Sequence, residues 1–349
     1  MCVASGIGWA VMATARVRKS TAPAAEKKSA LAKKTAPTKK TAPTKKTATV
    51  KKTAPTQKTA TVKKTATAKK AAPATKPAAA QKTATANAEN IRAAANRLVL
   101  GIDIGGSGIK GAPVDLREGR LAADRLRIDT PQPATPEACA VVVNQIVTHF
   151  TTMTSSNGPV GCTYPGVVWD GTTHTAANMD AAWIELNADA LLEEACKRPF
   201  TVMNDAQAAV LAEVRYGAAR GAEGLVLMLT FGTGIGSGLA YRGVAIPGIE
   251  FGHVRMHGHD AERYAAASVR DREKLSYKKW AEQVNDYLAR VEAMIWPEVI
   301  VLGGGVVSDA EKWVPRLKTR TPLVVAALGN DAGIVGAAIA ATTQTNRKR

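Results

Sequence analysis

The sequence is poor in the residues that could cross-link it or bind a structural metal. Its 349 residues include four cysteines, Cys2, Cys139, Cys162 and Cys196, and none of them forms a CxxC pair. This wide spacing predicts neither a zinc site nor a disulfide framework, and it is typical of a protein from a reducing cytoplasm. The apolar stretch Val3–Ala13 is shorter than the roughly 20 residues that a membrane-spanning helix needs, so we expect no membrane association.

Acidic residues are almost absent from the first quarter of the chain. Residues 1–90 contain 20 Lys or Arg but only two acids, Glu26 and Glu89, so their formal net charge of +18 equals that of the whole chain. Residues 91–349 contain 27 basic and 27 acidic side chains and are therefore neutral. The pI near 9.9 thus describes an N-terminal tail and not a basic enzyme surface.

That tail contains a six-residue repeat of the KKTAPT type, which occurs eight times over residues 27–74. The repeat has no aromatic and few large aliphatic side chains, so it cannot bury enough apolar surface to offset the entropy of ordering. We therefore expect residues 1–96 to be a disordered tail, and residues 343–349 to form a short basic tail. Extended Lys pairs about 19 Å apart could bind a polyanion, either polyphosphate or nucleic acid. A solvated linker is the simpler alternative.

Strands and helices alternate from residue 97 onward, which predicts an α/β fold. The expected strands are Leu98–Ile104, a strand around Val114, Arg125–Ile128, Pro159–Thr163, Phe200–Met203, Gly224–Leu229 and Val299–Leu302. The expected helices are Pro136–Phe150, Ala206–Tyr216, Lys278–Trp296 and Gly333–Ala341. In the first helix, the spacing of the apolar residues places four on one buried face, Val141, Val142, Ile146 and Phe150.

A glycine-rich turn follows the first of these strands and is a candidate phosphate site. Glycines let backbone N–H groups approach an anion closely, a serine adds a hydroxyl donor, and a lysine adds positive charge. An aspartate at the strand end is placed to hold Mg²⁺ through water. The residues concerned are Asp103, Gly105, Gly106, Ser107 and Lys110. The GxGxxG spacing is absent and Ile109–Asp115 looks like a returning strand, so this turn is not a dinucleotide-binding fingerprint.

Two further glycine turns also follow buried strands. They contain Gly232, Thr233 and Gly234 in one case, and Gly303, Gly304 and Gly305 in the other. Each alone is as readily a tight turn as a phosphate site. Three such turns at strand ends point to a ligand, because ligands gather at strand ends in α/β sheets.

Polar residues between and after these turns are candidates for catalysis. Asp205, which ends a strand beside Asn204, could accept a proton from a sugar hydroxyl that attacks phosphorus. Alone, this Asn-Asp pair is more often a helix cap. Glu250 and His253 are three residues apart and could bind vicinal hydroxyls. The HxxxHxH spacing that begins at His253 allows a metal site as a minor alternative, since no further ligand cluster follows.

Taken in order, these segments resemble the ROK sugar-kinase family, and more closely its polyphosphate glucokinase branch. The resemblance covers Leu98 to Ala341 and rests on DIGGSGIKG, YPG, NMDAAW, VMNDAQAAVLAE, LTFGTGIGSG, EFGHV and VIVLGGGV. It implies the two-lobed, actin-like and ribonuclease-H-like sugar kinase fold. The small lobe would comprise residues 97–205 plus about 330–342, and the large lobe residues 206–329. It also implies a homodimer.

The resemblance also implies roles for single residues. Asp205 would be the catalytic base, and Asn178, Asn204, Glu250 and His253 would bind the sugar. Asp103, the first glycine turn and Gly232–Gly234 would bind phosphate and Mg²⁺. Typical members carry a cysteine-rich zinc motif, CxCGxxGCLE, where this chain reads HGHDAERYAAA, so we expect no zinc. The closing Glu of that motif corresponds to Glu262, a further sugar ligand.

Three functions remain open from the sequence. The first is phosphorylation of glucose at its 6-hydroxyl with inorganic polyphosphate, and also ATP, in a Mg²⁺-dependent reaction. The second is a strictly ATP-dependent glucokinase whose tail binds nucleic acid. The third is a sugar-binding protein without catalysis, which the intact Asp205 disfavours. Six basic residues could form a polyphosphate track or a solvated helix face, namely Arg263, Arg270, Arg272, Lys274, Lys278 and Lys279.

Overall fold

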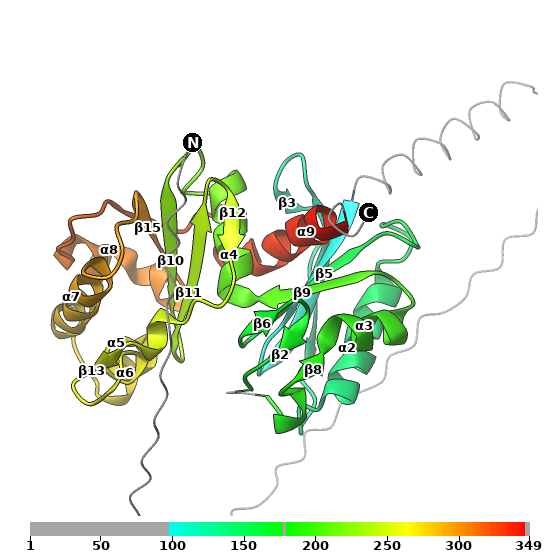
Figure 1. The fold of residues 1–349 in the computed structure, drawn as a ribbon, viewed down its shortest axis with the longest axis horizontal. Helices are drawn as coiled ribbons and strands as arrows, with labels where there is room; N and C mark the ends of the chain where they lie inside the picture. Colours follow the sequence, from blue (N-terminus) through cyan, green and yellow to red (C-terminus); the bar gives the residue numbers. More distant parts are fainter. Residues whose placement is uncertain (1–97, 177–178, 346–349) are drawn as a thin grey trace, which may run out of the picture. The chain divides into compact units, whose positions relative to one another are not determined.

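The computed structural model describes residues 98–176 and 179–345, which form two β-sheets covered by helices (Figure 1). The Lys-rich repeat, the rest of the tail up to residue 97, Asn178 and the last four residues lie outside the described part. No helix within residues 98–176 and 179–345 is long and apolar enough to cross a membrane. The expected α/β class is confirmed.

The first sheet has six strands in the order β3-β2-β1-β5-β9, with β4 paired to β2. Strand β1 is antiparallel to β2 but parallel to β5, which in turn is parallel to β9. The strands are β1 (Leu98–Ile104), β2 (Gly108–Asp115), β3 (Arg120–Leu121), β4 (Leu126–Asp129), β5 (Val160–Tyr164) and β9 (Phe200–Asn204). The β1–β2 hairpin confirms the predicted return of the chain after the first glycine turn.

The second sheet repeats this design in the order β12-β11-β10-β15-β16. Strands β10 and β11 form an antiparallel hairpin, and β10, β15 and β16 run parallel. The strands are β10 (Leu225–Phe231), β11 (Ile235–Tyr241), β12 (Val244–Ile246), β15 (Val299–Gly303) and β16 (Leu323–Val325). The first glycine turn therefore joins β1 to β2, and the second joins β10 to β11, so the two turns occupy corresponding places in two similar sheets.

Two helices meet between the sheets, α4 (Asp205–Tyr216) and α9 (Ala332–Thr345). Helix α9 packs on β1 and β5, whereas α4 packs on β10 and β11, and the two helices contact each other (Figure 1). Their contact is close because Gly336 has no side chain. A Cβ at Gly336 would lie 1.8 Å from the carbonyl oxygen of Ala208. The helix that begins at Asp205 is thus held directly against the closing helix of the chain.

The remaining helices cover the other faces of the sheets. Helices α2 (Pro136–His149) and α3 (Ala188–Cys196) pack together beside the first sheet. The second sheet is accompanied by α5 (Glu262–Ala265), α6 (Ala267–Arg272), α7 (Tyr277–Glu292) and α8 (Ala310–Trp313). Short 3₁₀ turns are η1 (Ala181–Trp183), η2 (Phe251–His253), η3 (Gly305–Asp309), η4 (Val314–Arg316) and η5 (Gly329–Asp331). Two small sheets complete the described part, β6 (Val168–Trp169) with β7 (Thr172–Thr173) and β8 (Leu186–Asn187), and β13 (Arg255–Met256) with β14 (His259–Asp260).

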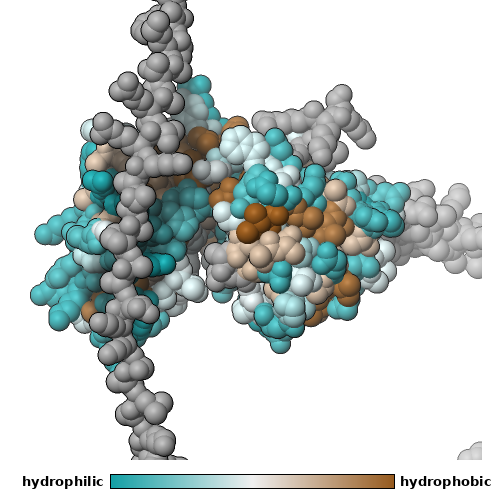
Figure 2. Space-filling model, turned by 60° about the horizontal axis from the view of Figure 1, so that its bottom comes forward, coloured by the Kyte–Doolittle hydropathy of each residue, from teal (hydrophilic) through white to brown (hydrophobic). Residues whose placement is uncertain are grey.

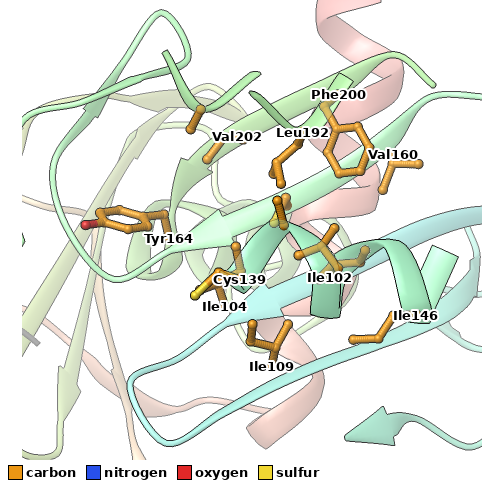
Figure 3. Packing of buried hydrophobic residues seen from close by; sticks show 14 of the residues in the cluster. Ile102, Ile104, Ile109, Cys139, Ile146, Val160, Tyr164, Leu192, Phe200 and Val202 are labelled. Carbon is orange, nitrogen blue, oxygen red and sulfur yellow. The ribbon is translucent and has the colours of Figure 1, made fainter. Parts of the chain in front are cut away.

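Each sheet has its own hydrophobic core. In the first, Ile102 and Phe200 from the strands pack with Ile146 of α2 and Leu192 of α3 (Figure 3). The second core centres on Phe231, whose ring makes edge-on contacts with three buried aromatic rings, those of Trp280, Tyr287 and Trp313. Such ring pairs each stabilise a fold by about 0.5–1.5 kcal/mol beyond the area that they bury. They anchor the residue immediately before the second glycine turn.

Three details of the predicted helices are wrong. The closing helix, expected over Gly333–Ala341, runs from Ala332 to Thr345. Val141 is 60% exposed, because the buried face of α2 follows Cys139, Val143 and Ile146, and Val141 lies on the opposite side. The helix expected to reach Trp296 ends at Glu292. Proline disfavours helical backbone in the residue before it, so Pro297 disfavours a helical Trp296. The predicted lobe boundaries stay a prediction.

Candidate active site

A cavity of about 210 Å³ lies where the two sheets face the starts of α4 and α9. Its walls come from the ends of β1, β2, β10 and β15 and from the loop before α9. The polar and backbone groups that matter most are those of Asp103, Lys110, Asp205, Thr230, Gly304 and Asn330. The cavity therefore gathers candidates from the first and third glycine turns with the candidate base.

Asn204 holds Asp205 in place by capping α4. The Oδ1 atom of Asn204 accepts a hydrogen bond from Gln207 N at 3.0 Å, as an N-cap does. Its Nδ2 atom donates to the Gly166 carbonyl at 3.1 Å. The cap interpretation is thus confirmed for Asn204, and it leaves the next residue, Asp205, free to face the cavity.

The carboxyl group of Asp205 is a stronger base than an ordinary aspartate. It faces the cavity, and although its side chain is still accessible to solvent, the surrounding protein removes enough hydration to raise its pKa to about 6. The negative charges of Asp103 and Glu250 also raise the pKa, whereas a hydrogen bond from Ala206 N at 2.7 Å opposes them. At pH 7 the carboxylate is still ionised and ready to accept a proton.

Asp103 is held by two neighbours on adjacent strands. Its Oδ1 accepts a hydrogen bond from Thr163 Oγ at 2.5 Å, and its Oδ2 lies 2.9 Å from Lys110 Nζ. Both neighbours are its register partners in the sheet, Lys110 across β2 and Thr163 across β5. Sequence reasoning missed Thr163, although the parallel strand next to β1 should end with a side chain beside Asp103. With Thr163 on one oxygen and Lys110 on the other, a water-mediated contact to Mg²⁺ fits Asp103 better than direct ligation.

The first glycine turn contributes less to the cavity than expected. Asp103 and Lys110 line the cavity, whereas Gly105, Gly106 and Ser107 are not among its lining residues. Ser107 is exposed. Gly105 closes the hairpin by donating from its N to the carbonyl of Gly108 at 3.1 Å. Phosphate binding by the turn backbone stays a prediction.

In the third glycine turn, Gly304 packs against the backbone of Phe231 at the end of β10, a position where only glycine fits. Gly303 and Gly304 line the 210 Å³ cavity. Gly304 has a φ of 90°, and a Cβ there would lie 2.3 Å from the carbonyl oxygen of Phe231. Since L side chains rarely adopt this backbone conformation, the glycine is required both for φ and for space.

A second cavity, of about 350 Å³, lies beside the second glycine turn. Its lining includes Gly232, Thr233, Arg270, Tyr277, Ser308 and Asp309. The guanidinium of Arg270 lies 4.2 Å from the ring centre of Tyr277, and its Nη2 lies 2.7 Å from Asp271 Oδ1. The Nε of Arg270 is buried without a hydrogen-bond partner. Among the six basic residues of the predicted track, Arg270 lines this cavity and the other five are exposed.

The predicted sugar ligands lie near one another around η2. His253 Nε2 is 4.0 Å from Glu250 Oε2, and Glu262 Oε2 accepts a hydrogen bond from Ile235 N at 3.4 Å, beside Gly234. Burial raises the pKa of Glu250; the Glu262 charge also raises it, and His253 opposes both. These carboxylates therefore interact with one another and, through Glu250, with Asp205.

Asp260 orients His253 and was missed by sequence reasoning. Its Oδ2 lies 3.3 Å from His253 Nδ1, and its Oδ1 is 3.0 Å from Arg255 Nη1. Hydrogen bonds from Arg255 and His253 hold the pKa of Asp260 below its usual range. An ionised Asp260 favours the tautomer of His253 with its proton on Nδ1, which leaves Nε2 facing Glu250.

The structure does not gather the sugar candidates into one hexose-sized pocket. Asn204 and Glu250 line a separate cavity of about 10 Å³, roughly the room for one water molecule. Asn178 lies outside the described residues. His257 packs its ring against Tyr264 with 4.6 Å between ring centres. Within residues 98–176 and 179–345, no group of three or more His, Cys, Asp or Glu side chains could hold a metal ion. The expected lack of zinc stays a prediction.

The fold and the cavity together define a class, an α/β sugar-kinase fold with an acidic residue facing a cavity between two sheets. The ROK family pattern matches residues 99–265. The chain is 49% identical over 259 residues to the polyphosphate glucokinase of Mycobacterium tuberculosis (strain CDC 1551 / Oshkosh), covering 74% of this chain and 96% of that protein. It is 50% identical over 243 residues to the polyphosphate glucokinase of Mycobacterium leprae (strain TN), covering 69% of this chain and 74% of that protein. The chain belongs to the ROK family.

Solved structures agree with this assignment. The inorganic polyphosphate/ATP-glucomannokinase from Arthrobacter sp. strain KM has a TM-score of 0.68 and 46% identity, with 71% of this chain and 100% of that chain covered. A ROK family glucokinase from Streptomyces griseus has a TM-score of 0.60 at 24% identity, with 70% of this chain and 99% of that chain covered, and it supports the fold alone. The sugar-kinase fold expected from the motifs is therefore confirmed.

Proposed function

We propose that this protein phosphorylates the 6-hydroxyl of glucose with inorganic polyphosphate as donor, and that ATP is a second donor. The observation that carries the proposal is Asp205, a carboxylate of raised pKa that faces a cavity shared with Asp103 and Lys110. The near 50% identity to polyphosphate glucokinases supports the acceptor and the donor. A strictly ATP-dependent glucokinase is the alternative.

In the proposed reaction, Asp205 accepts the proton of the glucose 6-hydroxyl as its oxygen attacks the terminal phosphorus of the donor. The new bond joins this oxygen to phosphorus, and the bond between that phosphorus and the bridging oxygen breaks. The shortened polyphosphate, or ADP, leaves with the electron pair. Lys110 and the backbone N–H groups of the glycine turns stabilise the negative charge on the transferred group.

Mg²⁺ fits this site at Asp103. The fit rests on the donor set, a carboxylate facing the phosphate cavity with Thr163 and Lys110 fixing its two oxygens. When bound, the ion would neutralise charge on the donor phosphates. Asp103 would hold the ion through water, and its contact with Lys110 keeps that ammonium group beside the cavity.

The sugar would be bound by Asn178, Asn204, Glu250, His253 and Glu262. The positions of Glu250, His253 and Glu262 around η2 support this proposal, because their carboxylate and imidazole groups suit sugar hydroxyls. The side chain of Asn204 is already used in capping, so it would contribute by orienting Asp205 as well.

The transferred phosphate would lie next to Asp205. The donor phosphates that follow it would bind to the second and third glycine turns, through Gly232, Thr233, Gly234, Gly303 and Gly304. The second cavity offers room there, and its Arg270 has a buried Nε atom without a partner. A phosphate oxygen is a suitable acceptor for such a group. The positive N-terminal tail would raise the local concentration of a polyanionic donor.

Assembly and location are further parts of the proposal. We propose a homodimer in the cytoplasm. On the face shown in Figure 2, hydrophobic residues form small groups among hydrophilic ones. Exposed apolar side chains such as Trp296, 74% exposed, and Trp169, 57% exposed, could contribute to a dimer contact.

The experiment is glucose 6-phosphate formation by the purified full-length protein in Mg²⁺ buffer, with long-chain polyphosphate and ATP in parallel. Turnover with polyphosphate above that with ATP supports the proposal. Turnover with ATP alone supports the alternative, and no turnover with either donor contradicts both.

A further inference from the structure

A fully buried carboxylate, that of Glu213, lies near the carboxyl end of the helix that begins at Asp205. It accepts three backbone hydrogen bonds, from Ala218 N at 2.7 Å, Ala327 N at 3.1 Å and Leu328 N at 2.8 Å. No ion pair within the described residues involves it. A buried charge is costly unless it is hydrogen-bonded, so these N–H groups are what makes an ionised Glu213 tolerable.

Two of these donors belong to the segment that carries the chain from β16 to α9. The same segment forms one wall of the 210 Å³ cavity, through Ala326, Gly329, Asn330, Ala332 and Gly333. The chain also passes from the first sheet toward the second at Asn204, where α4 begins. The Glu213 carboxylate therefore joins two segments that run between the sheets. One is α4, which begins at Asp205, and the other is the segment before α9, which forms the facing wall of the cavity.

The backbone at the end of α4 packs closely around the Glu213 carboxylate. A Cβ at Gly217 would lie 2.0 Å from Glu213 Oε2. Ala218 donates to the same oxygen, so the end of α4 curls around the carboxylate. A glutamine has the same shape as glutamate, but its NH₂ group is a donor and would face N–H groups instead of accepting from them.

We infer that Glu213 is a positioning residue for phosphoryl transfer: it fixes residues 326–333 so that this wall holds the donor against Asp205. This inference rests on the proposed function. It predicts that loss of the carboxylate displaces the donor more than the sugar, because three of the sugar candidates, Glu250, His253 and Glu262, lie around η2 on other segments. A displacement of about 1 Å at a reacting group can cost on the order of a hundredfold in rate.

Glu292 offers a matched control for the stability effect. It lies on α7, is 8% exposed, and accepts hydrogen bonds from Thr321 N at 2.7 Å and Arg320 N at 3.2 Å. It therefore also ties a distant loop to a helix through backbone N–H groups. Neither Glu292 nor residues 318–322 line the 210 Å³ cavity.

The test compares Glu213→Gln with Glu292→Gln in the full-length protein. Melting temperatures come first, then kcat and KM for polyphosphate at saturating glucose, and KM for glucose at saturating polyphosphate. We expect both variants to melt a few degrees lower than the wild type. Only Glu213→Gln should raise the polyphosphate KM or lower kcat, by about tenfold or more. The glucose KM should change less than twofold.

Wild-type kinetics in Glu213→Gln, or equal kinetic losses in both variants, would overturn the inference while leaving the glucokinase activity of the wild type intact. If Glu213→Gln does not fold, Glu213→Asp replaces it, since the shorter side chain keeps the charge but loses its reach to residues 327–328. The same loss with polyphosphate is then expected, and unchanged kinetics would again overturn the role. A wild type that does not phosphorylate glucose removes the proposed function itself.

Discussion

Asp103 and Lys110 are register partners across the β1–β2 hairpin, and their charged groups lie 2.9 Å apart at the edge of the cavity. The pair is partly exposed, with 18% of the Asp103 side chain and 25% of the Lys110 side chain accessible. An incoming phosphate can therefore reach the ammonium group and compete with Asp103 for it. The pair keeps a positive charge directed at the donor before the donor binds.

The first prediction concerns this charge. Lys110→Met keeps the length of the side chain but removes its charge, so a phosphate loses one charge-assisted hydrogen bond. We expect kcat/KM for polyphosphate to fall by about tenfold to a hundredfold, since such bonds contribute roughly 1.5–3 kcal/mol. Steady-state kinetics measure the change. The control is Lys197→Met, which removes an exposed lysine outside the cavity and should leave the kinetics unchanged; equal losses in both variants would contradict the assignment.

The second prediction concerns pH. Because Asp205 must be ionised to accept a proton, kcat/KM for glucose should fall as pH drops through about 6, the raised pKa of its carboxyl group in the free enzyme. The contribution of this carboxyl group to the stability of the protein depends on pH in the opposite direction. A raised pKa means that the native state holds this proton more tightly than the unfolded state, so this group's contribution to stability falls as pH rises from about 4 to about 6. The profile of kcat/KM from pH 4.5 to 8 measures the midpoint, and a midpoint at the ordinary aspartate pKa would show that the surroundings of Asp205 do not raise its pKa.

The third prediction separates the two cavities. Arg270→Ala should raise KM more for long polyphosphate than for a short donor such as tripolyphosphate, because only the longer chain extends past the second glycine turn. An effect of three- to tenfold is expected from the loss of one contact to a charged donor. Arg272→Ala is the matched control, since Arg272 is exposed, pairs with Glu273 and does not line this cavity. An equal rise in KM for long polyphosphate and for tripolyphosphate would show that Arg270 does not contact the extended part of the longer donor.

The fourth prediction concerns the N-terminal tail. Deletion of residues 1–90 removes a net charge of +18. We expect the KM for long-chain polyphosphate to rise at low salt and the difference to shrink near 1 M salt, where the Debye length is only about 3 Å. The ATP KM serves as the internal control, since ATP carries few charges. An unchanged polyphosphate KM at low salt would leave the tail without a role in donor capture.

Local features of this fold could be predicted from the sequence, and features that join distant segments could not. The strand Leu98–Ile104 and the turn after it follow from an apolar run and glycines, and the prediction of β1 is correct to the residue. The cap at Asn204 is likewise a short-range signal. Phe231 and its aromatic neighbours show the limit, because no spacing in the sequence indicates that α7 and α8 meet at this ring.

Two of the missed residues, Thr163 and Glu213, act across long sequence separations. Thr163 bonds to Asp103 over 60 residues, and Glu213 bonds to Leu328 over 115. Each side chain alone looks ordinary, a threonine at a strand end and a glutamate in a helix. Their importance arises from strand order and helix packing, which motif spacing does not contain. Within α2 the periodicity was nearly sufficient, since Val142, Ile146 and Phe150 are buried as predicted and only Val141 is exposed.

If Asp205 is the general base of glucose phosphorylation, Asp205→Asn removes the group that accepts the proton while keeping the size of the side chain. The measurement is glucose 6-phosphate formation from polyphosphate by the variant and the wild type at pH 7.5, with the melting temperature of each protein as the folding control. We predict a loss of at least a hundredfold in kcat, together with a melting temperature no lower than that of the wild type, because a neutral amide removes the repulsion between this carboxylate and those of Asp103 and Glu250. A folded Asp205→Asn protein with wild-type kcat would contradict the account.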